Sequence, residues 1–438
     1  MAIPSSPLAP IEAARNFLAN IQKPALLLVA VSGGSDSTGL LLALHEVLSS
    51  SGRDDVQLHS VTIDHALRPE AAAEARAVKT LCHGLNIPHH ILRWDGEKPK
   101  TGISAAARLA RYRLIGEVAG KIGATAIVVG HTLDDQLETI AMRSHRSAQA
   151  GMPGLSGMAD AVLYNARHWV LRPFLSVRRD DIRNYLAAIG QGWFDDPSND
   201  DDKYERVRVR KLSPDVELPF SEPPIERVKL SSHAAAFVTR AVQTYPAGLI
   251  KLSGDCLDED PAIFRYAIAA LACVAGGRAY PLAADSMDRV MAFVGSGKPG
   301  RLTAGRVIFD RRKEGLYLMR ENRDVPTITV AAGATAVWDQ RFEIANRSKM
   351  PVTVSGSASA DEEDATTTAV PAGVLKRAVL AQPHVRLEGA RYDDADLQSV
   401  TISPRLAPYD LFLPRFDLEL ANAIAMRLGR RIYLRLPI

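Results

Sequence analysis

The chain has 438 residues, enough for about three domains, and its 47% hydrophobic and 24% charged residues are ordinary for a globular protein. Lys and Arg (53) nearly balance Asp and Glu (50), so the net charge of +3 does not by itself indicate a nucleic-acid partner. The sequence shows no membrane span, no secretory signal and no Cys-x-x-Cys pair, which predicts a reduced, cytoplasmic protein with neither disulfides nor a metal–sulfur site.

The first half of the sequence alternates apolar runs with amphipathic stretches, which is typical of an α/β fold. The predicted elements are, in chain order, strand 25–31, helix 38–50, strand 56–63, helix 69–84, strand 89–94, helix 104–119, strand 125–129 and helix 133–143. Pro69 stands where helices prefer a proline, and Ser104 is the expected cap of its helix. The alternation predicts a doubly wound parallel sheet with right-handed crossovers.

The pattern changes after residue 151. The sequence predicts a strand over 161–170, a helix over 177–189, a proline-rich linker over 212–224, mostly helical structure over 225–294 and a short hairpin over 301–319. We therefore expect an α/β domain at residues 1–215, a mostly helical middle domain at 225–325 and a small α+β C-terminal domain at 326–438.

The strongest functional signal is the loop SGGSDS, residues 32–37, between a predicted buried strand and a predicted helix. In an open α/β sheet, this position lies at the carboxyl edge, where ligands bind. Two glycines let the backbone approach an anion, and the helix N-terminus supplies unpaired N–H groups. Asp36 suits an anion site only if a cation such as Mg²⁺ binds as well. The loop is not a Walker motif, because GxxxxGK[ST] is missing.

Two more polar segments occupy strand-to-helix junctions of the same predicted sheet. DHALRPE, residues 64–70, ends the second strand, and GHTLDDQLET, residues 130–139, ends the fourth. His131 and Asp135 are four residues apart and Asp135 and Glu138 three, so a helix would place these side chains on one face. Acids also suit a helix N-terminus without any catalytic role. A histidine at the same edge as the SGGSDS loop favours a functional site.

Basic residues are concentrated in two further segments. Arg108 and Arg111 share a face of the predicted helix 104–119, and the run 206–210 alternates arginine with valine. Between residues 143 and 183, seven arginines face three acids. Such segments suit phosphate contacts, which are mostly independent of base sequence, although a solvated surface would look the same.

Taken together, these motifs resemble those of the tRNA(Ile)-lysidine synthases, a family of the PP-loop ATP pyrophosphatase superfamily. The family motifs SGGxDS, DHxLRxE, EAxARxxRY and GHxxDDxxET resemble residues 32–37, 64–70, 104–112 and 130–139, and DDPSN at 195–199 with the basic run that follows is similar to a further family segment. Ser104 departs from the pattern, since the family usually has Glu there. Val207 also departs, at a position where Asn is common.

The resemblance implies an enzyme with the PP-loop, or adenine nucleotide α-hydrolase-like, fold that uses ATP and Mg²⁺. Such an enzyme adenylates the wobble cytidine of the tRNA(Ile) with anticodon CAU and then replaces AMP by the ε-amino group of free L-lysine. The product, lysidine, changes codon reading from AUG to AUA. The C-terminal domains would hold the tRNA. The sequence leaves open whether the chain forms a homodimer.

The resemblance and the charges of the side chains together suggest roles for the site residues. Asp36 would hold Mg²⁺, and His131 and Arg111 would stabilise the phosphate or the adenylate. Asp135 and Glu138 would hold the cationic lysine or take its proton. The residues expected to bind ATP are Ser32, Gly33, Gly34, Ser35, Asp36, Ser37, Asp64 and His65, and those expected to bind the other substrates are Arg108, Asp134, Arg206, Arg208 and Arg210.

Three other classes of protein share parts of this pattern. A tRNA thiolase built on the same loop would need a sulfur carrier or paired cysteines, whereas Cys82 stands alone in the α/β domain and Cys256 and Cys273 lie outside it. An amidating relative would use ammonia or a glutaminase with a nucleophilic cysteine. A non-catalytic RNA-binding protein would not need Asp36, Asp135 and Glu138 intact.

Overall fold

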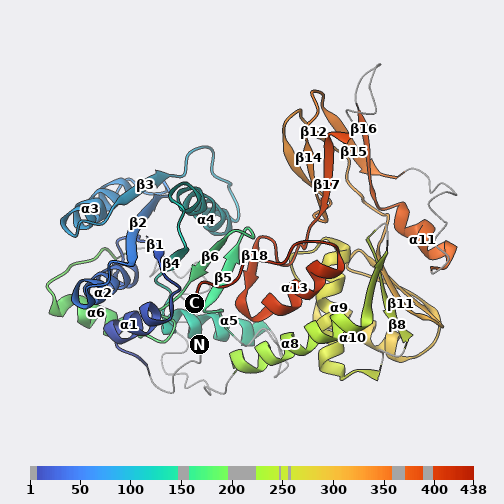
Figure 1. Ribbon diagram of the computed structural model, residues 1–438, viewed down its shortest axis with the longest axis horizontal. Coiled ribbons are helices and arrows are strands. Elements are labelled where there is room, and N and C mark those ends of the chain that lie inside the picture. Colours follow the sequence, from blue (N-terminus) through green and yellow to red (C-terminus); the bar gives the residue numbers. More distant parts are fainter. Residues whose placement is uncertain are drawn as a thin grey trace. The chain divides into compact units, whose positions relative to one another are not determined.

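The structure, a computed structural model, describes residues 7–146, 157–195, 223–245, 248–254, 258–357, 370–387 and 398–438. The chain divides into two compact units, Met1–Arg227 together with Leu434–Ile438, and Val228–Tyr433 (Figure 1). This boundary lies close to the end of the expected linker at 212–224. The further division expected at 325/326 stays a prediction.

A mostly parallel sheet forms the centre of the first unit. Its strands are β1 (Ala25–Ala30), β2 (Val56–Asp64), β3 (His89–Arg93), β4 (Ala126–Val129), β5 (Ala161–Tyr164) and β6 (His168–Leu171), which within this unit follow the order β5-β6-β4-β1-β2-β3. β1 is parallel to β2 and β4, β2 to β3 and β4 to β6, whereas β5 is antiparallel to β6. Leu27, Leu28 and Val29 of β1 are fully buried, as expected for a central strand covered on both faces.

Helices cover both faces of this sheet. They are α1 (Pro10–Asn20), α2 (Ser35–Ser51), α3 (Ala71–Gly84), α4 (Ile103–Ile122), α5 (Leu133–Arg146) and α6 (Arg179–Ala188). α1, α2 and α6 pack against one another, while α3 packs on β2 and β3 and α4 packs on β2, β4 and β6. Figure 1 shows these two groups on opposite sides of the strands. The expected doubly wound α/β fold is confirmed, with a mixed rather than wholly parallel sheet.

Two local predictions for this unit are wrong. The single strand expected over 161–170 is the antiparallel hairpin β5–β6, because Asn165 and Ala166 both have positive φ (50° and 52°) and form a tight turn. Ser104 does not cap α4: the cap is Gly102, whose φ of 67° suits glycine, and Ser104 lies inside the first turn. The helix α1 was not predicted, although Phe17 and Leu18 on its buried face are fixed in the core.

The second unit consists of helices and small antiparallel sheets. Its helices are α8 (Pro223–Ala241, which begins at the end of the first unit), α9 (Pro261–Gly276), α10 (Ala284–Gly295), α11 (Ala372–Val379), α13 (Leu418–Arg427) and the 3-10 helix η6 (Arg415–Asp417). Its strands are β7 (Val242–Tyr245), β8 (Leu249–Ser253), β9 (Gly300–Ala304), β10 (Val307–Arg312), β11 (Gly315–Arg320), β12 (Ile328–Val330), β13 (Thr335–Trp338), β14 (Phe342–Asn346), β15 (Val352–Gly356), β16 (Pro383–Leu387), β17 (Val400–Pro404) and β18 (Phe412–Pro414). They include a five-stranded sheet, β7-β8-β11-β10-β9, and the three-stranded sheets β12-β15-β16 and β13-β14-β17.

The middle part of the chain confirms the expected helices but has more strands than the single expected hairpin. α8, α9 and α10 occupy most of the stretch 225–294, whereas the stretch 301–319, expected as one hairpin, is the three-stranded antiparallel meander β9-β10-β11. The sequence does not predict β7 and β8: among the described strands, β7 pairs only with β8, and β8 joins the sheet by pairing with β11, which lies far along the sequence. The core formed by Leu249, Tyr317, Met319, Val374 and Leu375 joins α11 to this sheet. In the described ranges, no helix has both the length and the apolar character needed to cross a membrane.

Candidate active site at the carboxyl edge of the first sheet

The SGGSDS loop joins β1 to α2 and is closed by hydrogen bonds among its own residues. Gly33 has a φ of 90°, a conformation that favours glycine, and Gly34 is the N-cap of α2. The Ser37 hydroxyl accepts a hydrogen bond from the Ser32 N–H at 3.0 Å and donates one to the Gly34 carbonyl at 3.3 Å. The two glycines therefore stand directly before a helix N-terminus, a position that favours bound anions.

Neighbouring segments pack tightly against this loop. The Phe194 N–H donates to the Gly33 carbonyl oxygen at 2.9 Å, and a Cβ added at Gly33 would lie 2.9 Å from Phe194 Cδ2. A Cβ added at Gly130 would lie 2.9 Å from the backbone carbon and oxygen of Asp36. Gly130 follows β4, so its missing side chain lets the GHTLDDQLET segment begin in contact with the SGGSDS loop.

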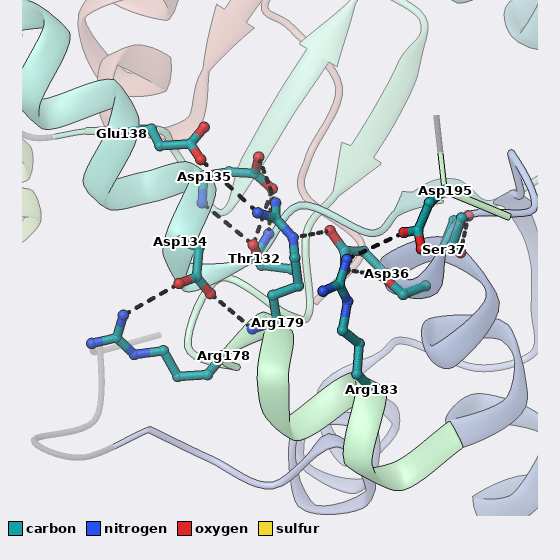
Figure 2. Close-up of polar contacts among 12 residues, drawn as sticks. Asp36, Ser37, Thr132, Asp134, Asp135, Glu138, Arg178, Arg179, Arg183 and Asp195 are labelled. Carbon is teal, nitrogen blue, oxygen red and sulfur yellow. Dashed lines mark hydrogen bonds and ion pairs between the residues drawn. The ribbon is translucent and has the colours of Figure 1, made fainter. Parts of the chain in front are cut away.

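An acidic cluster, Asp36, Asp135 and Glu138, surrounds the Arg179 guanidinium (Figure 2). Arg179 Nε lies 3.0 Å from Asp36 Oδ2, its Nη2 3.4 Å from Asp135 Oδ1 and its Nη1 3.9 Å from Glu138 Oε1. Arg179 is the first residue of α6, whereas Asp36 and Asp135 come from the first turns of α2 and α5 and Glu138 lies one turn further along α5. Three strand-to-helix junctions thus converge on one cation.

The first turn of α5 fixes two of the neighbouring carboxylates. The Thr132 N–H donates to Asp135 Oδ2 at 2.9 Å and the Asp135 N–H to the Thr132 hydroxyl at 3.3 Å, a reciprocal pair typical of a helix start. Asp134 instead accepts from the Arg179 N–H at 2.8 Å and from Arg178 Nη1 at 3.3 Å. Figure 2 shows Asp134 on the side of the helix turned toward Arg178. Asp134 therefore ties α5 to the start of α6.

Burial and the neighbouring charges shift the pKa values of Asp36 and Arg179. Burial raises the pKa of Asp36, while the neighbouring Arg179 lowers it and so opposes part of the shift. Burial lowers the pKa of Arg179, but Asp36, Asp135 and Glu138 raise it more, so the guanidinium stays charged. One cation faces three carboxylates, which leaves the cluster negative when all three are ionised.

A second group of polar side chains surrounds Arg172, which directly follows β6. Arg172 Nε donates to His131 Nδ1 at 3.0 Å, and its guanidinium also interacts with Tyr112 of α4. Arg108 and Arg111 lie over the Tyr112 ring, with their Cζ atoms 5.0 and 5.5 Å from its centroid. His131 and the arginines of α4 are thereby part of one basic region.

Asp64 and His65 lie at the end of β2. Asp64 is buried and accepts a hydrogen bond from the Ala66 N–H at 2.7 Å, in a turn where Ala66 has a φ of 50°. The His65 ring meets Trp94 edge-to-face at 6.0 Å. Burial and the nearby Arg111 lower the pKa of His65, while Asp64 raises it. The electrostatic interaction with Arg111 links this turn to the basic region of α4.

The expected site residues in the described ranges therefore gather at the carboxyl edge of the sheet. The loop contacts Gly130 and, through Arg179, the acids of α5, while His131, Arg111, Arg108 and His65 are linked through Arg172 and Tyr112. Arg206, Arg208, Arg210 and the departure at Val207 lie outside the described residues. The other departure, Ser104, is exposed near the start of α4. The roles of all these residues stay predictions.

Sequence reasoning missed two central residues, Arg172 and Arg179. Both belong to the arginine-rich stretch between residues 143 and 183, which the sequence alone indicates only as a local positive charge. A sharper signal was available: Arg172 follows an apolar strand, and Arg179 stands at the start of the next helix, as the known motifs do. Without the strand order, neither arginine could be assigned to the edge that carries the acids.

The backbone groups of the glycine loop and the Asp36 carboxylate suit the binding of a nucleotide with its divalent cation. The glycine loop offers backbone groups at a helix N-terminus, and a methyl group at Gly33 would collide with Phe194. In the described ranges, no three His, Cys, Asp or Glu side chains are grouped to hold a metal ion. Mg²⁺ is commonly bound by one or two carboxylates together with phosphate oxygens, an arrangement to which Asp36 could contribute.

Comparisons with known proteins identify the family. Residues 10–216 match the family of the PP-loop domain. The tRNA(Ile)-lysidine synthase of Rhizobium meliloti (strain 1021) is 41% identical over 99% of this chain and 98% of that protein. That of Mesorhizobium japonicum is 37% identical over 91% of each chain, and that of Brucella anthropi is 34% identical over 92% of this chain and 94% of the relative. The chain belongs to the tRNA(Ile)-lysidine synthase family.

Proposed function

We propose that this protein attaches L-lysine to carbon 2 of the wobble cytidine of the CAU-anticodon tRNA(Ile), using ATP and forming lysidine. The observation that carries the proposal is the convergence of the SGGSDS loop and the GHTLDDQLET segment on Arg179, in a chain that matches lysidine synthases over nearly its whole length. One negative and one basic region at a single sheet edge suit a reaction that joins a cationic amine to a phosphate-activated base.

In the first half-reaction, the oxygen on carbon 2 of cytosine attacks the α-phosphorus of ATP. The bond to the bridging oxygen breaks, and pyrophosphate leaves with the electron pair. Ser32, Ser35, Ser37 and the two glycines are suited to hold the β- and γ-phosphates, with Asp64 and His65 beside the adenosine. Mg²⁺, which we propose Asp36 holds, would neutralise charge on the phosphates. Arg111 and His131 are suited to stabilise the adenylate.

In the second half-reaction, the lysine ε-amine attacks carbon 2, and the bond from that carbon to oxygen breaks as AMP leaves. The amine must be neutral to attack, so a nearby base has to accept its proton. Asp135 and Glu138 are the proposed acceptors. Arg179 supplies one positive charge against the three carboxylates of the acidic cluster, so the cluster remains negative. This negative charge favours binding of the lysine ammonium group before its proton is lost.

The tRNA has to present its target base outside the stack for this chemistry. Arg108 on α4 is exposed beside the basic region, and we propose that it contacts the sugar–phosphate backbone of the tRNA. We also propose Asp134, Arg206, Arg208 and Arg210 as substrate-binding residues. A cytoplasmic location and a homodimer stay predictions from the sequence.

The buried thiols weigh against a sulfur-transfer reaction. Burial raises the pKa of Cys82, which is fully buried against Ser60, and raises that of Cys273 to about 12. Thiols with raised pKa are poor nucleophiles and poor metal ligands. Of the cysteines in the described residues, neither is therefore suited to carry sulfur.

The test is to incubate the full-length protein with ATP, Mg²⁺, labelled lysine and the CAU tRNA(Ile), and to follow label in the tRNA. We expect label that requires ATP and is lost when the wobble cytidine is replaced by uridine. Pyrophosphate release without label would indicate a nucleophile other than lysine. Neither label nor pyrophosphate would contradict the proposed function.

A further inference from the structure

His131 and Arg172 meet at the ends of two neighbouring parallel strands. β4 ends two residues before His131, and Arg172 directly follows β6, its parallel partner. The Arg172 Nε–H donates to His131 Nδ1 at 3.0 Å, and Nη1–H donates to the Ala159 carbonyl at 2.7 Å. Arg172 is only 6% exposed, so the hydrogen bond to His131 is shielded from water.

The chemistry of the two side chains determines which ring nitrogen carries the proton. A guanidinium group only donates hydrogen bonds and remains charged, so His131 Nδ1 must offer its lone pair. An imidazole whose Nδ1 accepts a hydrogen bond carries its proton on Nε2. A second proton on Nδ1 would place one N–H against another and a second positive charge beside a buried guanidinium.

We infer that Arg172 is a positioning residue that holds His131 as the neutral Nε2–H tautomer, so that His131 donates a hydrogen bond to the phosphate or adenylate and does not accept the proton of lysine. This inference rests on the proposed function and deepens it. As the new carbon–nitrogen bond forms and AMP leaves with the carbon–oxygen electron pair, the amine proton passes instead to a carboxylate of Asp135 or Glu138.

The position of Arg172 is itself fixed on several sides. Its guanidinium interacts with the hydroxyl of Tyr112, and the Tyr112 ring packs against Tyr164 with the centroids 5.4 Å apart. The Arg172 N–H also donates to the Asp160 carbonyl at 2.9 Å. At metal sites, removing a buried partner that orients a histidine ligand typically lowers metal affinity or activity by about tenfold to a hundredfold. We expect a loss of activity of similar size when Arg172 is replaced.

The tautomer of the unmodified protein can be measured directly. Full-length protein labelled with nitrogen-15 histidine is examined by long-range proton–nitrogen correlation spectroscopy, and the His131 signals are identified by their loss in His131→Gln. We expect a pyrrole-type Nε2 and a pyridine-type Nδ1. A proton on Nδ1, in either the other tautomer or a doubly protonated ring, would overturn the inference. A wild-type protein that incorporates no lysine would contradict the proposed function but not this readout.

Variants test the consequence for the reaction. In Arg172→Met, we expect a mixture of tautomers and a fall of about tenfold to a hundredfold in the rate of tRNA-dependent pyrophosphate release, with a smaller change in the KM for ATP. Arg172→Lys retains a hydrogen-bond donor, so it should recover part of the Nε2–H tautomer and part of the rate of pyrophosphate release. His131→Gln retains an N–H donor but no base, so it should be clearly more active than His131→Ala. Equal losses in these two would overturn the donor role, even if Arg172→Met fails to fold.

Discussion

Arg179 determines the charge that Asp36 presents at the proposed magnesium position. Burial favours the protonated form of this carboxyl group, and Arg179 is the largest influence in the opposite direction. A carboxylate must be ionised to hold a cation, so the activity should be present above the pKa of Asp36 and be lost as the pH falls through it. Arg179 therefore widens the pH range in which the site can work.

We expect Arg179→Met to move the acid limb of the pH profile to higher pH, because the pKa of Asp36 rises when its cationic partner is removed. The measurement is kcat/KM for ATP in pyrophosphate release, which reports on the free enzyme. Arg178→Met is the matched control, since Arg178 pairs with Asp134 at 3.3 Å and is partly exposed. An unchanged limb in Arg179→Met, or the same shift in both variants, would assign the limb to another group.

Asp36 itself is tested by Asp36→Asn, which keeps the shape of the side chain but removes its charge. We expect tRNA-dependent pyrophosphate release to fall by about a hundredfold or more, because a metal ion contributes several kcal/mol to stabilising charge in phosphoryl chemistry. Asp180→Asn, an exposed acid in the first turn of α6, is the control and should remain close to wild type. Full activity in Asp36→Asn would remove Asp36 from the proposed machinery.

At the scale of elements, the site depends on how closely the end of β4 approaches the loop after β1. The Cβ of Gly130→Ala would lie 2.9 Å from the backbone of Asp36 and 3.0 Å from Ser37 Cα, and backbone atoms cannot move aside as a flexible side chain can. We expect a cost of about 1–3 kcal/mol in stability and a raised KM for ATP, because the loop must shift.

Thermal unfolding and ATP kinetics measure these two effects of Gly130→Ala. The control is Gly120→Ala in α4, whose Cβ would make an ordinary contact of 3.7 Å with the His168 ring. Because glycine is unfavourable inside a helix, this change should be neutral or stabilise by up to about 1 kcal/mol. An unchanged KM for ATP in Gly130→Ala would mean that the loop does not depend on this close approach.

The elements that could be predicted from the sequence are those that carry their own signal. β1 was predicted because an apolar run ends at a glycine loop, and Asp36, Asp135 and Glu138 because their motifs follow such strands. β7 and β8 could not be predicted, since they form a short hairpin that belongs to a sheet only because β8 pairs with the distant β11. Arg179 could not be assigned a role for the same reason: an arginine at a helix start looks like a surface residue until the sheet order brings it beside Asp36.

At the scale of the whole molecule, the second unit has an ionic centre of its own. Asp339, in the turn after β13, is fully buried and is bound by Arg306, Arg320 and Arg341. Arg320 Nε lies 3.1 Å and Arg341 Nε 2.6 Å from Asp339 Oδ2. Burial lowers the pKa of Arg341 to about 10, against the effect of Asp339. The carboxylate thus joins the sheet that contains β11 to the sheet that contains β13.

Asp339→Asn would leave these guanidinium groups without their carboxylate, and we expect it to destabilise the second unit by about 3–5 kcal/mol. Trp338, the neighbouring residue, is the only tryptophan in the sequence of that unit and is fully buried, so its fluorescence reports on unfolding there, with Trp338→Phe as the blank. The control Asp288→Asn removes a surface ion pair with Arg265 and should change stability by less than about 1 kcal/mol.

The denaturant midpoints of the tryptophans distinguish the outcomes for Asp339→Asn. If the two units unfold independently, the midpoint reported by Trp338 falls, while the midpoint reported by the remaining tryptophans, all in the first unit, does not. A shared shift would instead mean that the whole chain unfolds as one cooperative unit, and an unchanged Trp338 midpoint would mean that the second unit does not depend on the Asp339 charge.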